Sequence, residues 1–127
     1  MIDTICVVGM GYVGLTLSVL LSELGFKVVG IEKNKDLIKK LNKGEPHFYE
    51  ENLGIRLKAQ IMNEQFSIAN KIPNNVSYDV FIIAVGTPLE RDKKAPNLSS
   101  LKDVIQEVGK NLRKGSLVCM RSTAPVG

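Results

Sequence analysis

Apolar positions follow two patterns along this chain, and together they predict an alternating series of strands and helices. Short, nearly continuous apolar runs are typical of strands buried on both faces of a parallel sheet. Apolar residues that recur every three or four positions indicate helices with one buried face. The first pattern predicts strands at 4–8, 27–31, 65–69, 80–85 and 116–120; the second predicts helices at 12–24, 35–42, 51–62 and from 98 to a stop at Gly115.

Helix boundaries and buried faces follow from the same pattern. Asn34 is placed to cap the second helix. Segment 44–51 contains too many helix breakers and aromatic residues to continue that helix and is predicted as a loop, and segment 70–75 is predicted as a short turn or a broken helix. The recurring apolar positions of the four helices are Val13, Leu17, Leu20, Leu21 and Leu24; Leu37, Ile38 and Leu41; Leu53, Ile55, Leu57 and Ile61; and Leu101, Val104, Ile105, Val108 and Leu112.

The order of these elements predicts an α/β fold. A strand series interrupted by helices indicates a Rossmann-type, doubly wound parallel sheet in the order 3-2-1-4-5, with right-handed crossovers and helices on both faces. A chain of 127 residues without internal repeats or linkers fits a single domain, 1–127.

The first strand ends in a glycine turn with the spacing G-x-G-x-x-G, formed by Gly9, Gly11 and Gly14. In such a turn the first glycine allows a sharp turn, the second lets the backbone approach a pyrophosphate, and the third lets the helix pack closely on the strand. The helix N-terminus then presents free N–H groups and a positive dipole end to a phosphate. This context predicts a dinucleotide site.

Glu32 ends the second predicted strand, eighteen residues after Gly14. This is where such folds place the acid that binds the adenine ribose. A carboxylate there accepts a hydrogen bond from the 2′-hydroxyl and repels a 2′-phosphate, so NAD is favoured over NADP. Lys33 and Lys35 are neighbouring cations that could soften this repulsion.

Two further segments follow predicted strands at the same carboxyl edge of the sheet. They are Gly86-Thr87-Pro88 and Ser122-Thr123. Because ligands of open parallel sheets bind outside this edge, the hydroxyls are placed to meet a cofactor. Four separate sequence features therefore converge on one predicted crevice.

Composition excludes several other classes of protein. The net charge of +4 is spread along the chain and forms no nucleic-acid stripe. Residues 4–22 carry no charge, but Asp3 and the glycine spacing argue against a signal peptide or a membrane span. Cys6 and Cys119 lie in apolar strand-like runs, which fits buried thiols in a reducing cytoplasm rather than a disulfide framework. His47 is the only histidine, so no metal site is expected.

Several motifs together resemble one family. They are G-Y-V-G-L at 11–15, Gly44 followed by Glu50 or Glu51 and Leu53, V-G-T-P at 85–88, and S-T-A-P-V-G at 122–127. The chain is similar over essentially its whole length to the amino-terminal part of the nucleotide-sugar dehydrogenases, which include UDP-glucose, GDP-mannose and UDP-N-acetylmannosamine enzymes. The G-E-P-H segment at 44–47 favours the UDP-N-acetylmannosamine or a related UDP-hexosamine branch.

The resemblance implies oxidation of the C6 alcohol of a UDP-sugar to a uronic acid, in two hydride transfers to two NAD through a thioester on a cysteine. It further implies residue roles. The pyrophosphate would be held by Gly9, Met10, Gly11, Tyr12, Val13 and Gly14, the ribose by Glu32, and the nicotinamide side by Val85, Gly86, Thr87 and Pro88. Ser122 and Thr123 would lie at the cofactor, with Thr123 positioning the catalytic water or active-site hydrogen bonds.

The chain also departs from the family pattern. The basic residue usual five positions after the ribose acid is here Leu37, so such a contact would come from Lys33 or Lys35 or be absent. Glu32 replaces the more usual Asp. The family's nucleophilic cysteine, with its lysine and aspartate partners and most sugar-binding residues, has no match in the chain, so we expect a domain that binds NAD without completing the reaction.

Two alternatives remain open from the sequence. One is a nucleotide-sensing or assembly module without redox chemistry, for which self-association as a homo-oligomer is the expected signature. The other is a different β-hydroxyacid-type dehydrogenase with the same glycine turn.

Overall fold

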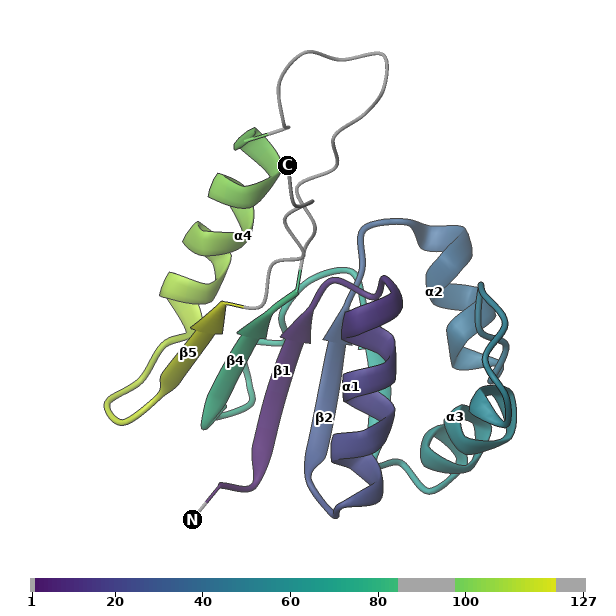
Figure 1. Ribbon diagram of the computed structural model, residues 1–127. Helices are drawn as coiled ribbons and strands as arrows, with labels where there is room; N and C mark the ends of the chain where they lie inside the picture. Colours follow the sequence, from purple (N-terminus) through teal and green to yellow (C-terminus); the bar gives the residue numbers. More distant parts are fainter. Residues whose placement is uncertain (1, 85–97, 121–127) are drawn as a thin grey trace, which may run out of the picture.

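The computed structural model describes residues 2–84 and 98–120 of the chain. These residues form a five-stranded, fully parallel sheet in the order β3-β2-β1-β4-β5 (Figure 1). The strands are β1 (Thr4–Val8), β2 (Lys27–Ile31), β3 (Phe66–Ala69), β4 (Val80–Ile83) and β5 (Leu117–Met120). The helices are α1 (Tyr12–Glu23), α2 (Lys35–Asn42), α3 (Leu53–Met62) and α4 (Leu98–Asn111). The predicted fold class, element order and strand order are confirmed.

Element ends differ from the sequence predictions by a few residues, and the backbone explains two of them. Helix α1 ends before Gly25, whose φ of +103° is left-handed and ends helical geometry. Helix α3 begins at Leu53 because Asn52 has a φ of +65°. The strand predicted at 80–85 ends at Ile83 in the structure, and Val85 lies outside the described residues.

Two apolar clusters cover the two faces of the sheet. On one face, α1, α2 and α3 pack over alternating strand residues such as Ile5, Val7 and Ile82. On the other face, Val104 and Val108 of α4 pack against a second set of strand residues, which includes Cys6, Val8, Ile31, Phe81 and Ile83. The alternation in β1 and β4 thus places helices on both faces, as predicted (Figure 1).

The buried face of α1 differs from the face that the leucine spacing indicates. The buried residues are Gly14, Leu15, Ser18, Val19 and Ser22, whereas Leu20 and Leu24 are exposed, Leu24 at 66%. Small residues lie against the sheet because they let the helix axis approach it closely. The Ser18 and Ser22 hydroxyls donate to the carbonyls of Gly14 and Ser18 at 2.7 and 2.8 Å, so their burial leaves no polar atom unpaired.

Three other positions of the apolar repeats are also wrong as buried positions. Ile55 of α3 is 74% exposed. Ile105 within α4 and Leu112, which directly follows α4, are also exposed. The buried residues of these helices are Leu53 and Leu57 in α3, with Ile61 partly buried beside them, and, among the described side chains of α4, Val104 and Val108. The predicted inward face of α2, with Leu41 buried and Leu37 and Ile38 packed against the core, is confirmed.

The two cysteines lie in strands, as expected, with different degrees of burial. Cys6 is fully buried, and its burial raises the pKa of the thiol to about 12, so it is protonated and unreactive near neutral pH. Cys119 in β5 is only half-buried, because β5 is an edge strand. Both are free thiols. No helix within residues 2–84 and 98–120 is long and apolar enough to cross a membrane.

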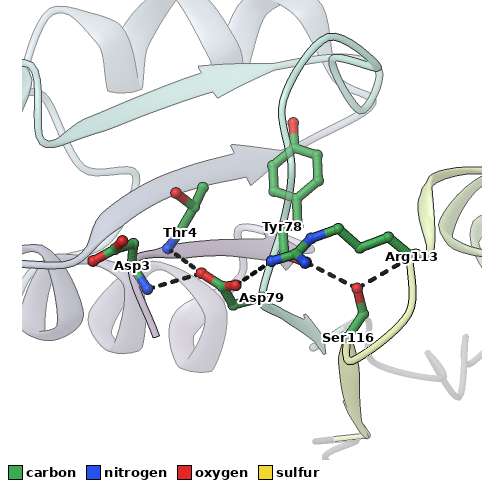
Figure 2. Close-up of polar contacts among 6 residues, drawn as sticks. All are labelled: Asp3, Thr4, Tyr78, Asp79, Arg113 and Ser116. Atoms are coloured by element: carbon green, nitrogen blue, oxygen red, sulfur yellow. Dashed lines mark hydrogen bonds and ion pairs between the residues drawn. The ribbon is translucent and has the colours of Figure 1, made fainter. Parts of the chain in front are cut away.

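Polar contacts connect the amino-terminal ends of three strands. The Asp79 carboxylate accepts backbone N–H bonds from Asp3 at 2.8 Å and Thr4 at 3.1 Å, and it pairs with the Arg113 guanidinium. The Ser116 hydroxyl donates to the Tyr78 carbonyl at 2.9 Å (Figure 2). Segments far apart in sequence are thereby joined at the edge opposite the predicted crevice.

Candidate functional site

The glycine turn between β1 and α1 has the close packing that its spacing predicts. Gly9 has a φ of +100°, and its N–H donates to the Ile31 carbonyl at 2.8 Å, which joins the turn to the end of β2. A Cβ on Gly14 would lie 1.7 Å from the Gly9 carbonyl oxygen. No L side chain fits there, so Gly9 and Gly14 are fixed as glycines by the chain itself.

Neither neighbouring atoms nor backbone conformation require a glycine at position 11. Its φ of −73° suits any residue, and a Cβ built on it would meet nothing within 4 Å. Gly11 is the N-cap of α1, and it has no side chain to bond the first-turn N–H groups; that turn also contains no acidic residue. The open space in front of Gly11 therefore adjoins N–H donors and the positive end of the helix dipole, which suits an anionic group.

Glu32 is held at the carboxyl end of β2 by two backbone donors. Its Oε1 accepts from the Met10 N–H at 3.3 Å, and its Oε2 accepts from the Asn34 N–H at 3.0 Å. Asn34 also caps α2, as predicted, by accepting from the Leu37 N–H at 3.1 Å. The cap and the glycine turn thus orient the carboxylate beside the turn, where a ribose hydroxyl would meet it.

An apolar cavity of about 190 Å³ adjoins Gly9 and Glu32. Its walls come from the ends of β1 and β2, the segment after β3, and α4. They consist of Val8, Gly9, Ile31, Glu32, Lys33, Asn70, Ile72, Val104 and Glu107. A flat aromatic base is the kind of group that such a cavity accommodates.

Sequence reasoning missed six residues of this cavity as site residues, namely Val8, Ile31, Asn70, Ile72, Val104 and Glu107. Glu107 did carry a signal, because it lies three residues after Val104 and one before Val108 and so falls beside the buried stripe of α4. Asn70 and Ile72 lie in the segment after β3 that resisted prediction, and only the fold places it beside α4.

The comparisons with known proteins agree with this geometry. A family model described as the UDP-glucose/GDP-mannose dehydrogenase family, NAD binding domain, matches residues 3–127. The chain belongs to this family. Its cofactor is accordingly NAD.

Relatives of this NAD-binding domain differ in the sugar that their names state. The chain is 37% identical to a UDP-N-acetyl-D-mannosamine dehydrogenase of Campylobacter jejuni. The alignment covers 98% of this chain and 30% of that relative. It is 33% identical to a UDP-glucose 6-dehydrogenase of Pseudomonas aeruginosa, in an alignment that covers 97% of this chain and 27% of the relative. The structure of UDP-N-acetyl-mannosamine dehydrogenase from Pyrococcus horikoshii matches with a TM-score of 0.84 at 35% identity, over 98% of this chain and 29% of that one.

The chain therefore spans about three tenths of the length of these relatives. Their common property is the family, and their sugars are not the same. The comparisons thus establish an NAD-binding domain of a nucleotide-sugar dehydrogenase family without selecting the sugar.

The remaining residues of the predicted NAD-binding turn contribute in different ways. The Met10 side chain is fully buried, with its Sδ 2.8 Å from the position of a Cβ on Gly30, so only the backbone of Met10 faces the site edge. The Tyr12 hydroxyl donates to Glu50 Oε1, and its ring lies 5.1 Å from that of Phe48. Val13 is half-buried in the first turn of α1.

Lys33 follows Glu32 at the rim of the cavity. Its Nζ lies 4.0 Å from Asp103 Oδ2, and both side chains are exposed. A pair this open contributes little to stability, so Lys33 is available to a ligand.

Other predicted site residues lie outside the described residues: Val85, Gly86, Thr87, Pro88, Ser122 and Thr123. The strands that precede them, β4 and β5, end side by side, with Ile83 opposite Met120. The placement of these six residues at the cofactor stays a prediction.

His47 and the acidic residues give no indication of a metal centre in the part of the chain that the structure describes, where no group of three candidate ligands gathers. The His47 ring lies 4.9 Å from that of Phe48. Burial lowers the pKa of His47, an effect that Glu32 opposes, so the imidazole is neutral at physiological pH.

Proposed function

We propose that this chain is the NAD-binding domain of a nucleotide-sugar 6-dehydrogenase that oxidises the C6 alcohol of a UDP-sugar to a uronic acid, with UDP-N-acetylmannosamine or a related UDP-hexosamine as the substrate. Relatives from Campylobacter jejuni and Pyrococcus horikoshii, both named for UDP-N-acetylmannosamine, support this choice of sugar. The G-E-P-H segment at 44–47 supports it independently.

The observation that carries the cofactor assignment is the linear order of three features along one sheet edge. The open space at Gly11 beside free N–H groups would take the pyrophosphate, the fixed Glu32 carboxylate the adenine ribose, and the apolar cavity the adenine. The spatial order of these three features matches the order of pyrophosphate, ribose and adenine in the dinucleotide. The residues present therefore fit NAD.

Each part of the chain has a distinct task in this proposal. The α1 N–H groups bind the pyrophosphate, and Glu32 accepts from the ribose 2′-hydroxyl and repels a 2′-phosphate. Val85, Gly86, Thr87 and Pro88 line the nicotinamide side, Ser122 adjoins it, and Thr123 positions the catalytic water. When bound, NAD accepts hydride from the alcohol carbon of the sugar.

We further propose that the chain alone binds NAD without completing the oxidation. Cys6 is buried with a pKa of about 12, and Cys119 lies in edge strand β5, so neither matches the nucleophile of the family. Incubation of the chain with NAD and UDP-sugars is expected to produce no NADH, measured by its near-ultraviolet absorbance. Sustained NADH formation would contradict this part of the proposal.

Calorimetric titration with NAD and NADP tests the cofactor site, and Gly11→Ala supplies the matched variant. We expect NAD to bind more tightly than NADP and Gly11→Ala to weaken NAD binding by about tenfold or more, because a methyl group enters the space of the pyrophosphate. The open surroundings and ordinary φ of Gly11 predict an unchanged fold, checked by urea unfolding. No NAD binding at millimolar concentration, or equal binding by the variant, would contradict the assignment.

A further inference from the structure

Glu107 brings a carboxylate to a cavity whose other α4 residue, Val104, is apolar. The residue is half-buried, and its Oε2 accepts a short hydrogen bond from the Ile72 backbone N–H. This bond fixes the side chain against the segment that follows β3. The carboxylate is thus a fixed acceptor at the cavity wall rather than a freely moving surface charge.

The polar side chains around the cavity divide by element. Glu32 and Lys33 come from the end of β2, Asn70 from the segment after β3, and Glu107 from α4. Glu32 already accepts from Met10 and Asn34 beside the glycine turn, and Lys33 is an exposed donor near Asp103. The acceptor on the α4 wall is therefore Glu107.

The chemistry of a purine determines which edge would meet this wall. The base is joined to its ribose through N9, so a ribose at Glu32 leaves the opposite edge, with N1 and the 6-substituent, directed away from β2. At this edge adenine has a 6-amino donor beside the acceptor N1, whereas hypoxanthine has a 6-carbonyl oxygen beside an N1–H donor. A carboxylate accepts from the amino group and repels the oxygen.

We propose that Glu107 is a specificity-determining residue that recognises the adenine of NAD by accepting a hydrogen bond from its 6-amino group. This inference rests on the proposed NAD site and adds base recognition to it. The apolar walls hold the base, while Glu107 distinguishes it from a base with an oxygen at the same position. A site built to bond a polar group discriminates strongly against an analogue that lacks it.

Nicotinamide hypoxanthine dinucleotide provides the probe, because its base has a carbonyl oxygen in place of the 6-amino group and an N1–H donor in place of the acceptor N1, so a carboxylate at the 6-position meets an oxygen rather than a donor. Calorimetry of the wild-type chain is expected to give at least about tenfold tighter binding of NAD, as fits a hydrogen bond to a charged acceptor. Equal affinity of the two dinucleotides would overturn the inference and leave the NAD site intact. Failure of both to bind at millimolar concentration would contradict the proposed function and the inference with it.

Glu107→Gln assigns the discrimination to this side chain. Its amide oxygen can keep the bond from the Ile72 N–H while the NH₂ group faces the base, where it suits an oxygen and not an amino group. We expect the preference for NAD to be lost or reversed, mainly by weaker NAD binding and tighter binding of the hypoxanthine analogue. A preference that survives in Glu107→Gln would overturn the assignment.

Glu64→Gln is the matched control, because it removes one negative charge from an exposed position after α3. It is expected to keep the wild-type preference for NAD. Urea unfolding of both variants checks that the fold is intact, and Glu107→Asp, which keeps the charge but retracts it by one methylene, is expected to show an intermediate preference if Glu107→Gln unfolds.

Discussion

The glycines of the β1–α1 turn and helix α1 are glycine for different physical reasons. Gly14 has no room for a side chain, because a Cβ would lie 1.7 Å from a backbone oxygen of Gly9. A Cβ on Gly11 would meet nothing within 4 Å, and its φ of −73° suits any residue. We therefore expect stability and NAD binding to depend on different glycines of the same motif.

Gly14→Ala is expected to destabilise the fold by about 3 kcal/mol or more, because the overlap is with backbone and no side-chain rotation relieves it. The measurement is the free energy of unfolding from urea titration. Gly109→Ala in α4 is the control, since its Cβ meets nothing within 4 Å. That change is expected to stabilise the fold by about 0.5–1 kcal/mol through helix propensity. Equal effects of the two changes would contradict this account of the turn.

Helix α3 illustrates how an element is stabilised by one narrow stripe. Leu53 and Leu57 are fully buried against the core, while Ile55 of the same helix is exposed. The helix is also joined to α1 by a bidentate pair, in which Arg56 Nε and a terminal nitrogen donate to Glu23 at 2.9 and 2.6 Å. Its attachment therefore depends on residues at specific faces rather than on total apolar content.

Leu57→Ala is expected to lower the free energy of unfolding by about 2–5 kcal/mol, because it leaves a cavity in the core. The matched change Ile55→Ala removes a side chain of the same size from the surface and is expected to alter stability by less than about 0.5 kcal/mol. Urea unfolding of the two variants decides the matter. Comparable losses would mean that α3 packs differently.

At the scale of the whole molecule, the two edges of the sheet carry different groups of residues. The carboxyl edge carries the glycine turn, Glu32 and the apolar cavity. The amino edge carries Asp79, whose bonds to Asp3 and Thr4 and to Arg113 join three distant segments (Figure 2). We therefore expect substitutions at the amino edge to change stability without changing NAD binding at the proposed site.

The backbone N–H groups of Asp3 and Thr4, followed by Arg113, lower the pKa of Asp79 below its usual value of 3.8. A carboxyl with a lowered folded-state pKa stabilises the fold above its unfolded pKa, and this contribution is lost as the pH falls through the folded pKa. Asp79→Asn should therefore lower the urea midpoint at pH 7, with a difference from wild type that shrinks below about pH 4.

Asp103→Asn is the control for this experiment, since it changes an exposed carboxylate 4.0 Å from Lys33. We expect little change in its urea midpoint at either pH. NAD affinity of Asp79→Asn at neutral pH is expected to equal that of wild type, because the substitution lies at the opposite edge. A stability difference that does not depend on pH would contradict the role assigned to the Asp79 charge.

Much of the fold and part of the site could be predicted because local sequence carried the signal. The apolar runs of β1 and β2, the glycine spacing and the acid at the end of β2 each depend on steric or periodic demands within a few residues. The leucines of α1 misled the prediction, because Leu20 and Leu24 have helical spacing but face outward. Periodicity identifies the apolar positions on one side of a helix, whereas close packing against the sheet decides which side of the helix is buried.

The sequence by itself determined the α/β class, the strand order and the two ends of the glycine turn, since these follow from periodicity, glycine sterics and chain connectivity, and the resemblance of its motifs indicated the family. Only the tertiary structure decided that Ser18 and Ser22 lie against the sheet, that Asp79 joins three segments, and that Glu107 reaches the cavity beside Ile72. The physical reason is distance along the chain. Glu107 and Ile72 are 35 residues apart, and no local pattern records a contact that packing of α4 on the sheet creates.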